Sequence, residues 1–188
     1  MPHVVGSGTL SFSDAGNGTF SYAVLGATQT KAIVRVDLGT GAQPTCTYSA
    51  TTPDFAAAAN YQDLWWASSG AESGWGINFA HQGDSIFATW YTYDAGGMPL
   101  WLSVLAQRVG AGNVYTGQLY RTSGPRFDAY DPTKAVPVQV GTATLTFADG
   151  NNATFSYTTT GAAGLPAVTQ SKQISRFRFA AVGGTVCQ

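Results

Sequence analysis

The residues best suited to binding chemistry are concentrated between Asp63 and Leu105. This stretch contains all five tryptophans of the chain: Trp65, Trp66, Trp75, Trp90 and Trp101. Apolar and polar side chains alternate in GWGINFAHQ, SIFATWYTY and PLWLSVLAQ, a period of two that predicts half-buried β-strands. Aromatic planes beside short polar side chains suit a neutral polyhydroxylated or amide-bearing ligand. The plane covers C–H faces, while the amide and hydroxyl groups form directional hydrogen bonds.

Two short connections set the expected pairing of these strands. With Gly83-Asp84 as a two-residue turn and the next hairpin centred on Gly96, the expected pairs are Gly76–Tyr91, Ile77–Trp90, Asn78–Thr89, Thr89–Ser103, Trp90–Leu102 and Tyr91–Trp101. One face is then apolar and is expected to be core: Ile77, Phe79, Ile86, Ala88, Trp90, Leu100, Leu102 and Val104. The other face carries the candidate ligand-binding residues, with Gly76 expected to leave space beside them: Asn78, Thr89, Tyr91, Tyr93, Trp101 and Ser103. A one-residue slip would exchange the two faces.

Glu72 begins the segment Glu72-Ser-Gly-Trp-Gly76, which follows a loop of small residues. Two interpretations of this carboxylate stay open. It can bond a ligand hydroxyl, which makes Glu72 a seventh candidate ligand-binding residue. It can also satisfy backbone amides of its own loop as part of a capped turn.

The sequence offers little for catalysis. Of the two histidines, His3 is near the first residue and His81 adjoins the expected turn at Gly83. No Gly-x-Ser-x-Gly elbow and no metal-ligand spacing occurs. Pairing Glu72 with another carboxylate for glycoside hydrolysis is conceivable, but no spacing requires it. We therefore expect no enzyme activity, no catalytic residues, no metal ligands and no cofactor.

Composition restricts the class of partner. Charged residues make up 10% of the 188 residues, against about 25% in an average soluble domain, and the formal net charge is -1. No Lys/Arg cluster attracts nucleic acid, and no run of 18 apolar residues predicts a helix that spans a membrane. The opening MPHVVGSGTL lacks the features of a signal peptide, so we expect the signal to have been removed or the chain to be part of a longer one.

An internal repeat organises the chain. Residues 5–22 align without a gap on residues 140–157, at a shift of 135. After a six-residue insertion the shift becomes 141, and it aligns Gln29, Lys31, Ile33, Arg35 and Cys46 with Gln170, Lys172, Ile174, Arg176 and Cys187. Residues 1–48 are therefore assigned as a partial repeat of three strands and a Cys tail, and residues 49–188 as the complete unit. We expect the two to form one compact structural unit.

The expected fold is all-β and antiparallel. Short Asp/Asn/Gly connections separate three strands before residue 48 and seven or eight after it. About eight sequential strands form an up-and-down barrel or a sandwich, and the three extra N-terminal strands extend a sheet or replace strands in a neighbouring copy. Cys46 and Cys187 match no zinc or redox pattern, so a disulfide between them is expected, with two free thiols as the alternative.

The segment from Trp65 to Leu102, with Glu72-Ser-Gly-Trp-Gly-Ile-Asn78 at its centre, resembles a poorly characterised repeat of secreted proteobacterial proteins. Gly117-Gln-Leu-Tyr-Arg-Thr-Ser-Gly-Pro125 and the trailing Cys187 fit the same pattern, so the resemblance covers nearly the whole chain. It implies an exported accessory module, often next to a hydrolase or protease domain, and it supplies no catalytic residues. The strand count is also similar to that of avidin-like and lipocalin-like barrels, by fold analogy alone.

Three functions follow from these observations. The first is a non-catalytic extracellular or periplasmic binding module for glycan or another cell-surface polymer. The second is a structural or assembly module in which the N-terminal half-copy pairs with a neighbouring repeat and the aromatic face is buried. The third is a barrel that binds a small molecule inside, with the polar-aromatic face as its lining.

Overall fold

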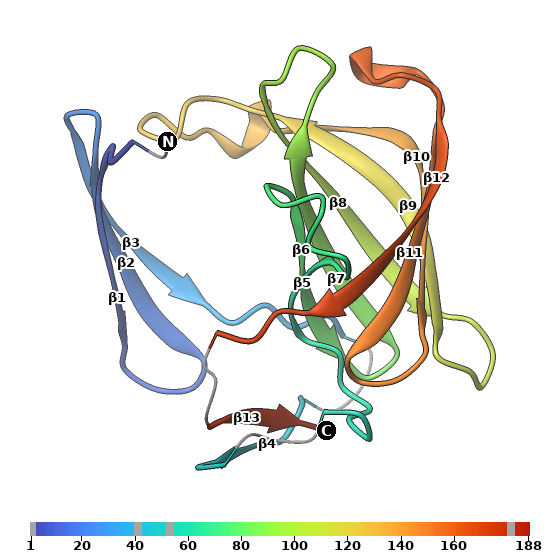
Figure 1. Ribbon diagram of the computed structural model, residues 1–188. Helices are drawn as coiled ribbons and strands as arrows, with labels where there is room; N and C mark the ends of the chain where they lie inside the picture. The colour runs from blue at the N-terminus through green and yellow to red at the C-terminus, as the bar shows by residue number, and fades with distance from the viewer. Residues whose placement is uncertain (1–2, 40–42, 52–54, 180–182) are drawn as a thin grey trace. The chain divides into compact units, whose positions relative to one another are not determined.

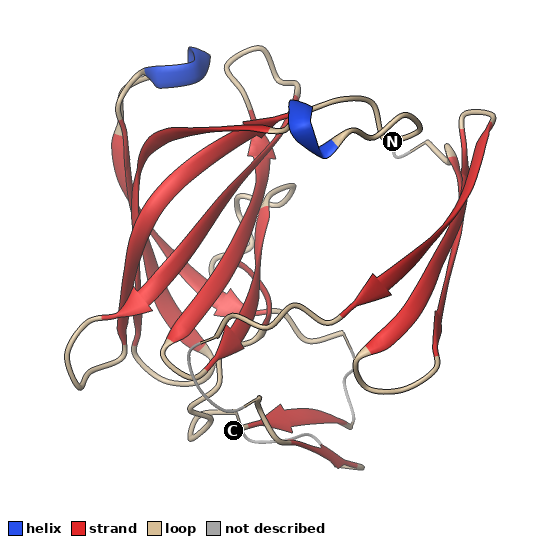
Figure 2. Cartoon of the chain, turned by 180° about the vertical axis from the view of Figure 1, so that it is seen from behind, coloured by secondary structure: helices blue, strands red, loops and turns tan. Residues whose placement is uncertain are grey.

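Eight strands of the chain close into an antiparallel barrel. The computed structural model describes residues 3–39, 43–51, 55–179 and 183–188. Within these residues, all regular structure is strand apart from two three-residue helical turns, η1 (Pro132–Lys134) and η2 (Ala162–Gly164) (Figure 2). The barrel strands are β5 (Asp63–Ala67), β6 (Gly76–Gln82), β7 (Ser85–Tyr93), β8 (Pro99–Arg108), β9 (Val114–Ser123), β10 (Val136–Phe147), β11 (Asn152–Thr159) and β12 (Thr169–Arg176).

The barrel has up-and-down topology. Neighbouring strands in space are neighbours in the chain, from β5 round to β12, and β12 pairs with β5 to close the ring (Figure 1). The all-β prediction is therefore confirmed, in its barrel form rather than as a sandwich. Closure leaves none of these eight strands with an unpaired edge, which matters in a chain with few charges to protect one.

The two predicted hairpins of the tryptophan-rich segment are confirmed. Gln82 pairs with Ser85 across a two-residue turn, in which Gly83 adopts φ 54°, a left-handed conformation that glycine reaches without steric cost. The next hairpin closes at Tyr93 and Pro99, and the Asp94 carboxylate accepts hydrogen bonds from the amides of Gly96 and Met98, each at 2.9 Å. All six expected cross-strand pairs occur.

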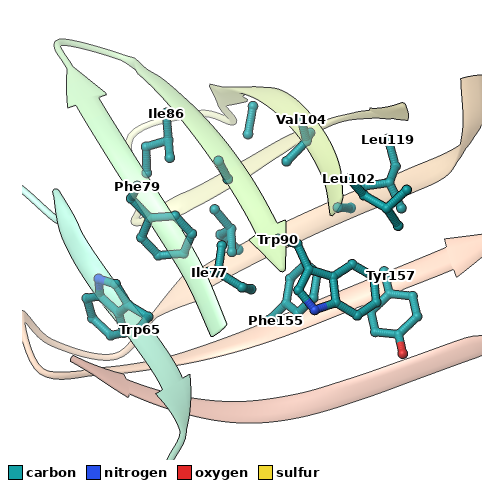
Figure 3. Close-up of a cluster of buried hydrophobic side chains, with 14 of the residues drawn as sticks. Trp65, Ile77, Phe79, Ile86, Trp90, Leu102, Val104, Leu119, Phe155 and Tyr157 are labelled. Atoms are coloured by element: carbon teal, nitrogen blue, oxygen red, sulfur yellow. The ribbon is translucent and has the colours of Figure 1, made fainter. Parts of the chain in front are cut away.

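The barrel interior is filled by apolar side chains from alternate strand positions. All eight residues expected to be core are buried, and they pack with Trp65, Leu119, Leu145, Phe155 and Tyr157 from other strands (Figure 3). Phe147 lies in an aromatic cluster, stacked on Tyr61 with ring centroids 3.6 Å apart and edge-on to Trp65 and Phe79. The polar-aromatic face is therefore not the lining of the barrel.

A second, three-stranded sheet comes from the N-terminal part of the chain. Its order is β1 (Gly6–Phe12), β2 (Asn17–Val24) and β3 (Ala27–Val34). Contacts divide the chain into two compact units. The first consists of Met1–Asp37 with Gly124–Ala135, and the second consists of Leu38–Ser123 with Val136–Gln188.

The duplicated hairpin turns use the same side-chain chemistry in both units. Asp14 accepts hydrogen bonds from the amides of Gly16 and Asn17, at 2.7 and 2.9 Å. Asp149 likewise accepts from Asn151 and Asn152, at 2.6 and 2.9 Å. Hydrogen bonds to the charged carboxylate hold both pKa values below the ordinary value: for Asp14 the largest cause is the Gly16 amide, and for Asp149 it is the side-chain amide of Asn152, followed by the Asn151 amide.

The predicted disulfide between Cys46 and Cys187 is confirmed. It joins β4 (Cys46–Ser49) to β13 (Gly184–Cys187), which pair as a two-stranded antiparallel sheet. The bond links positions 141 residues apart. Among the described residues, no helix is long and apolar enough to cross a membrane.

Candidate ligand-binding face

Three large aromatic side chains project from the outside of the barrel on β7 and β8. Tyr91, Tyr93 and Trp101 are 51%, 54% and 50% exposed. Tyr91 and Trp101 lie directly opposite each other on adjacent strands. Because the side chains alternate along each strand, the neighbours Trp90, Leu100 and Leu102 point into the core while these aromatics face outward.

A row of short polar side chains runs across the same face. Asn78 pairs with Thr89, and Thr89 pairs with Ser103 on β6, β7 and β8. Asn78 is exposed, and Thr89 and Ser103 are half-buried. The amide and two hydroxyls therefore lie beside the aromatic pair, as the sequence predicted.

The same face contains residues that the sequence interpretation left out. Phe87 and Leu105 oppose each other on β7 and β8, and they are 40% and 46% exposed. On β9, Tyr120 pairs with Ser103 and is half-buried. Phe87 is two residues from Thr89 on β7, and Leu105 is two residues from Ser103 on β8. Because side chains alternate between the two faces of a strand, the sequence could have predicted that Phe87 and Leu105 share this outer face.

Gly76 does not leave open space for a ligand. A Cβ at this position would lie 3.2 Å from the carbonyl oxygen of Trp65 and 3.5 Å from Cδ1 of Leu64. The expectation of a vacant position beside the aromatics is therefore wrong. The missing side chain instead lets the backbone of β5 approach β6 closely.

Glu72 is held by side chains outside this face. Its Oε2 atom accepts a hydrogen bond from the Trp75 indole N–H at 2.9 Å and lies 2.6 Å from the ammonium of Lys172. The bond from Lys172, followed by the bond from Trp75, holds the pKa of Glu72 below its ordinary value. The carboxylate thus bonds an indole and an ammonium, rather than the loop amides that one interpretation of the sequence expected.

The Glu72–Trp75–Lys172 cluster joins the segment between β5 and β6 to β12, next to the short pairing of β12 with β5. The pairing of β12 with β5 reaches only from Ile174 to Arg176, and beyond it the amide of Ser68 bonds the carbonyl of Gln173 at 3.0 Å. Trp75 packs on the core, and the Lys172 ammonium lies 5.3 Å from its ring centroid. This arrangement gives the Glu-Ser-Gly-Trp-Gly segment a structural role.

His81 is part of the core rather than of a site. It is 3% exposed, its Nδ1 accepts the Tyr61 amide hydrogen at 2.9 Å, and its Nε2 lies 2.9 Å from the carbonyl oxygen of Gly83. The ring is therefore neutral with hydrogen on Nε2. Burial is the main cause that lowers its pKa below the usual value of 6.5. Within the described ranges, no group of three or more His, Cys, Asp or Glu side chains is placed to hold a metal ion.

One small cavity lies at an end of the barrel. Its volume is about 250 Å³, and it is lined by Trp90, Leu100, Tyr157 and Leu165 among others. The Trp90 indole N–H is buried without a hydrogen-bond partner among the described atoms. This volume lies below the roughly 300 Å³ at which ordinary small-molecule pockets begin.

The chain matches no protein-family model, no curated protein and no solved structure.

Proposed function

We propose that this protein is a non-catalytic, exported binding module that holds a neutral glycan or another cell-surface polymer on the outer face of β6, β7 and β8. The observation that carries the proposal is the exposed Tyr91–Trp101 pair. The core of the barrel is already filled by buried aromatics such as Trp65, Trp90 and Phe155, so packing does not require two half-exposed rings side by side on two strands.

The chemistry of the face favours an uncharged ligand. The aromatic pair and the polar row Asn78–Thr89–Ser103 contain no ionisable acid or base apart from the tyrosine hydroxyl. Sugar rings present flat C–H faces that pack on aromatic planes, and their hydroxyls match the amide and hydroxyl groups of the row. The aromatic pair lies on the outside of a barrel, so this part of the face suits a segment of an extended polymer better than an enclosed small molecule.

Export to an oxidising compartment is part of the proposal. Disulfides persist outside the cytosol, and Cys46 and Cys187 are joined. The low charge and the resemblance of Glu72-Ser-Gly-Trp-Gly76 to a secreted repeat support an extracellular or periplasmic accessory role beside a hydrolase domain.

Binding to insoluble polysaccharides and peptidoglycan tests this function. We expect the wild-type chain to be retained on at least one polymer in a pull-down and glycan-array series. Y91A/W101A should weaken that binding by about 30-fold or more, as expected for removal of aromatic hot spots. Tyr48→Ala is the matched control, because Tyr48 is 70% exposed and lies outside the face. Unchanged retention of a folded double variant would refute the proposal.

A further inference from the structure

The sheet β1–β3 reproduces the part of the barrel formed by β10–β12. At the shifts of 135 and 141, the inward-facing positions that are identical in the two copies include Leu10 and Leu145, Phe12 and Phe147, Phe20 and Phe155, Tyr22 and Tyr157, Ile33 and Ile174, and Arg35 and Arg176. Two other inward positions differ by one methyl group, with Gly8 and Gly18 in place of Ala143 and Ala153. Outward positions are mixed: Thr9 and Thr144 are identical, whereas Ala32 and Gln173 differ.

In the barrel, β5–β9 cover this set of residues. Leu145, Phe155 and Ile174 are at most 2% exposed, and Phe147 is 4% exposed. The Trp90 ring packs on Phe155 and Tyr157, with centroid distances of 5.1 and 4.6 Å.

Arg176 is also covered in the barrel. Its guanidinium lies 3.3 Å from an Asp63 oxygen and donates to the carbonyl of Asn60 at 3.0 Å. Arg35, its counterpart in β1–β3, is exposed. The corresponding backbone bond is nevertheless present in both units, from Arg35 N–H to Gly16 and from Arg176 N–H to Asn151.

In β1–β3 the same inward face is largely open. Leu10 is 58% exposed and Phe12 is 69% exposed, and Ile33 is half-buried. Among the described residues of this unit, the segment 124–135 covers the end around Tyr22, where the Tyr22 hydroxyl bonds the carbonyl of Phe127 at 3.3 Å.

A recess of about 560 Å³ remains on this face. It is lined by Phe20, Tyr22, Phe127 and Tyr130, among others. In the barrel, the Trp90 indole packs on the equivalents of Phe20 and Tyr22. The recess therefore lies where the first unit has no counterpart of this indole.

We infer that β1–β3 is the closing sheet of a second barrel, and that its inward face binds a further copy of the β5–β9 segment. The edges of the sheet are consistent with this partner. Both β1 and β3 are edge strands in a sheet of order β1-β2-β3, whereas β10 pairs with β9 and β12 pairs with β5. A copy of β5–β9 would pair with both edges and cover Leu10 and Phe12 with the residues that cover Leu145 and Phe147. This partner does not depend on the polymer-binding face, which lies on the outside of β6–β8.

Addition of a second copy of these five strands to the full chain tests this partner. In the extended protein, a second copy of residues 55–139 is fused directly before Val5. Val5 aligns with Val140, so the Gln139 of the added copy is followed by Val5 just as the original Gln139 is followed by Val140. Hydrogen exchange of the amides in β1–β3 is compared with that in the parent chain, and β10–β12 serve as an internal reference. We expect exchange in β1–β3 to slow by about 100-fold or more, because closure converts an open sheet into part of a cooperative core.

Two variants of the extended protein sharpen the result. Phe12→Asp places a charge inside the new barrel and should restore fast exchange in β1–β3, while the adjacent outward substitution Ser11→Asp should not. Equal exchange rates in the parent and extended chains would overturn the inference. So would a parent dimer in which β1–β3 of one copy is protected by β1–β3 of the other, because the partner would then be a second copy of this sheet.

Discussion

Trp101 differs from the other four tryptophans in being half-exposed on the outside of the barrel. Trp65 and Trp90 are core residues, and Trp66 and Trp75 are half-buried against Phe177 and the core. The alternation of side chains along a strand explains why Trp90 is buried and Trp101 is half-exposed. Trp90 pairs with Leu102, which faces inward, and Trp101 pairs with Tyr91, which faces outward. At the residue scale, the richness in tryptophan mainly reflects packing, and the proposed binding depends on one of the five together with Tyr91.

The buried His81 makes stability depend on pH. Its pKa is lowered in the folded state, so between that pKa and the unfolded value near 6.5 the unfolded chain binds more protons. The contribution of neutral His81 is therefore fully present above about pH 6.5 and is lost as the pH falls below it. We expect the Tm of the wild type to decrease from pH 7.5 to pH 5.

The substitution His81→Gln should flatten that decrease, because glutamine does not titrate. His3→Gln is the control, since His3 is exposed near the first residue. Thermal unfolding followed by circular dichroism across this pH range checks the prediction. A His81→Gln variant whose Tm falls as steeply as that of the wild type would contradict it.

At the scale of strands and hairpins, local patterns predicted most of the candidate face. Alternation in SIFATWYTY and PLWLSVLAQ, together with the turn at Gly83, was enough to assign the register and therefore the inward and outward residues. The environment of Glu72 could not be predicted in this way, because its partner Lys172 is 100 residues away in the sequence. The contact joins the segment between β5 and β6 to β12, so it depends on the closure of the barrel, which no local pattern encodes.

The two copies of the three-stranded element give a matched pair of core substitutions. Phe147→Ala should destabilise the protein by about 3–5 kcal/mol, because Phe147 is buried among four aromatic rings. The equivalent Phe12→Ala should change stability by no more than about 0.5 kcal/mol, since Phe12 is 69% exposed. Urea unfolding of the barrel monitored by tryptophan fluorescence measures both, and equal losses would contradict the assignment of the two sheets.

At the scale of the whole molecule, the chain contains a closed barrel and a separate three-stranded sheet. This sheet, β1–β3, has the inward-facing residues of the barrel strands β10–β12 but is not part of a closed barrel. The repeat predicted from the sequence explains this similarity, and the Tyr22–Gln29 and Tyr157–Gln170 hydrogen bonds occur in both copies. The sequence did not indicate that the segment 124–135, between β9 and β10, would pack in the same compact unit as β1–β3.

The disulfide is expected to contribute strongly to global stability. Its cysteines are 141 residues apart, and in the chain-entropy model a loop of that length corresponds to about 4–5 kcal/mol. We expect C46S/C187S to unfold at a correspondingly lower denaturant concentration than the oxidised wild type. Reduced wild type should match the double variant, and a variant as stable as the oxidised protein would contradict the prediction.

The most direct test of the proposed binding function is hydroxyl-radical footprinting with the polymer that retains the protein. Oxidation of Tyr91, Tyr93 and Trp101 is measured by mass spectrometry with and without the polymer, and the exposed Tyr48 and Tyr130 are the references. We predict several-fold protection of the three face residues, with Tyr48 and Tyr130 unchanged. Protection confined to other residues, with Tyr91 and Trp101 oxidised as fast as in the free protein, would contradict a ligand-binding role for this face.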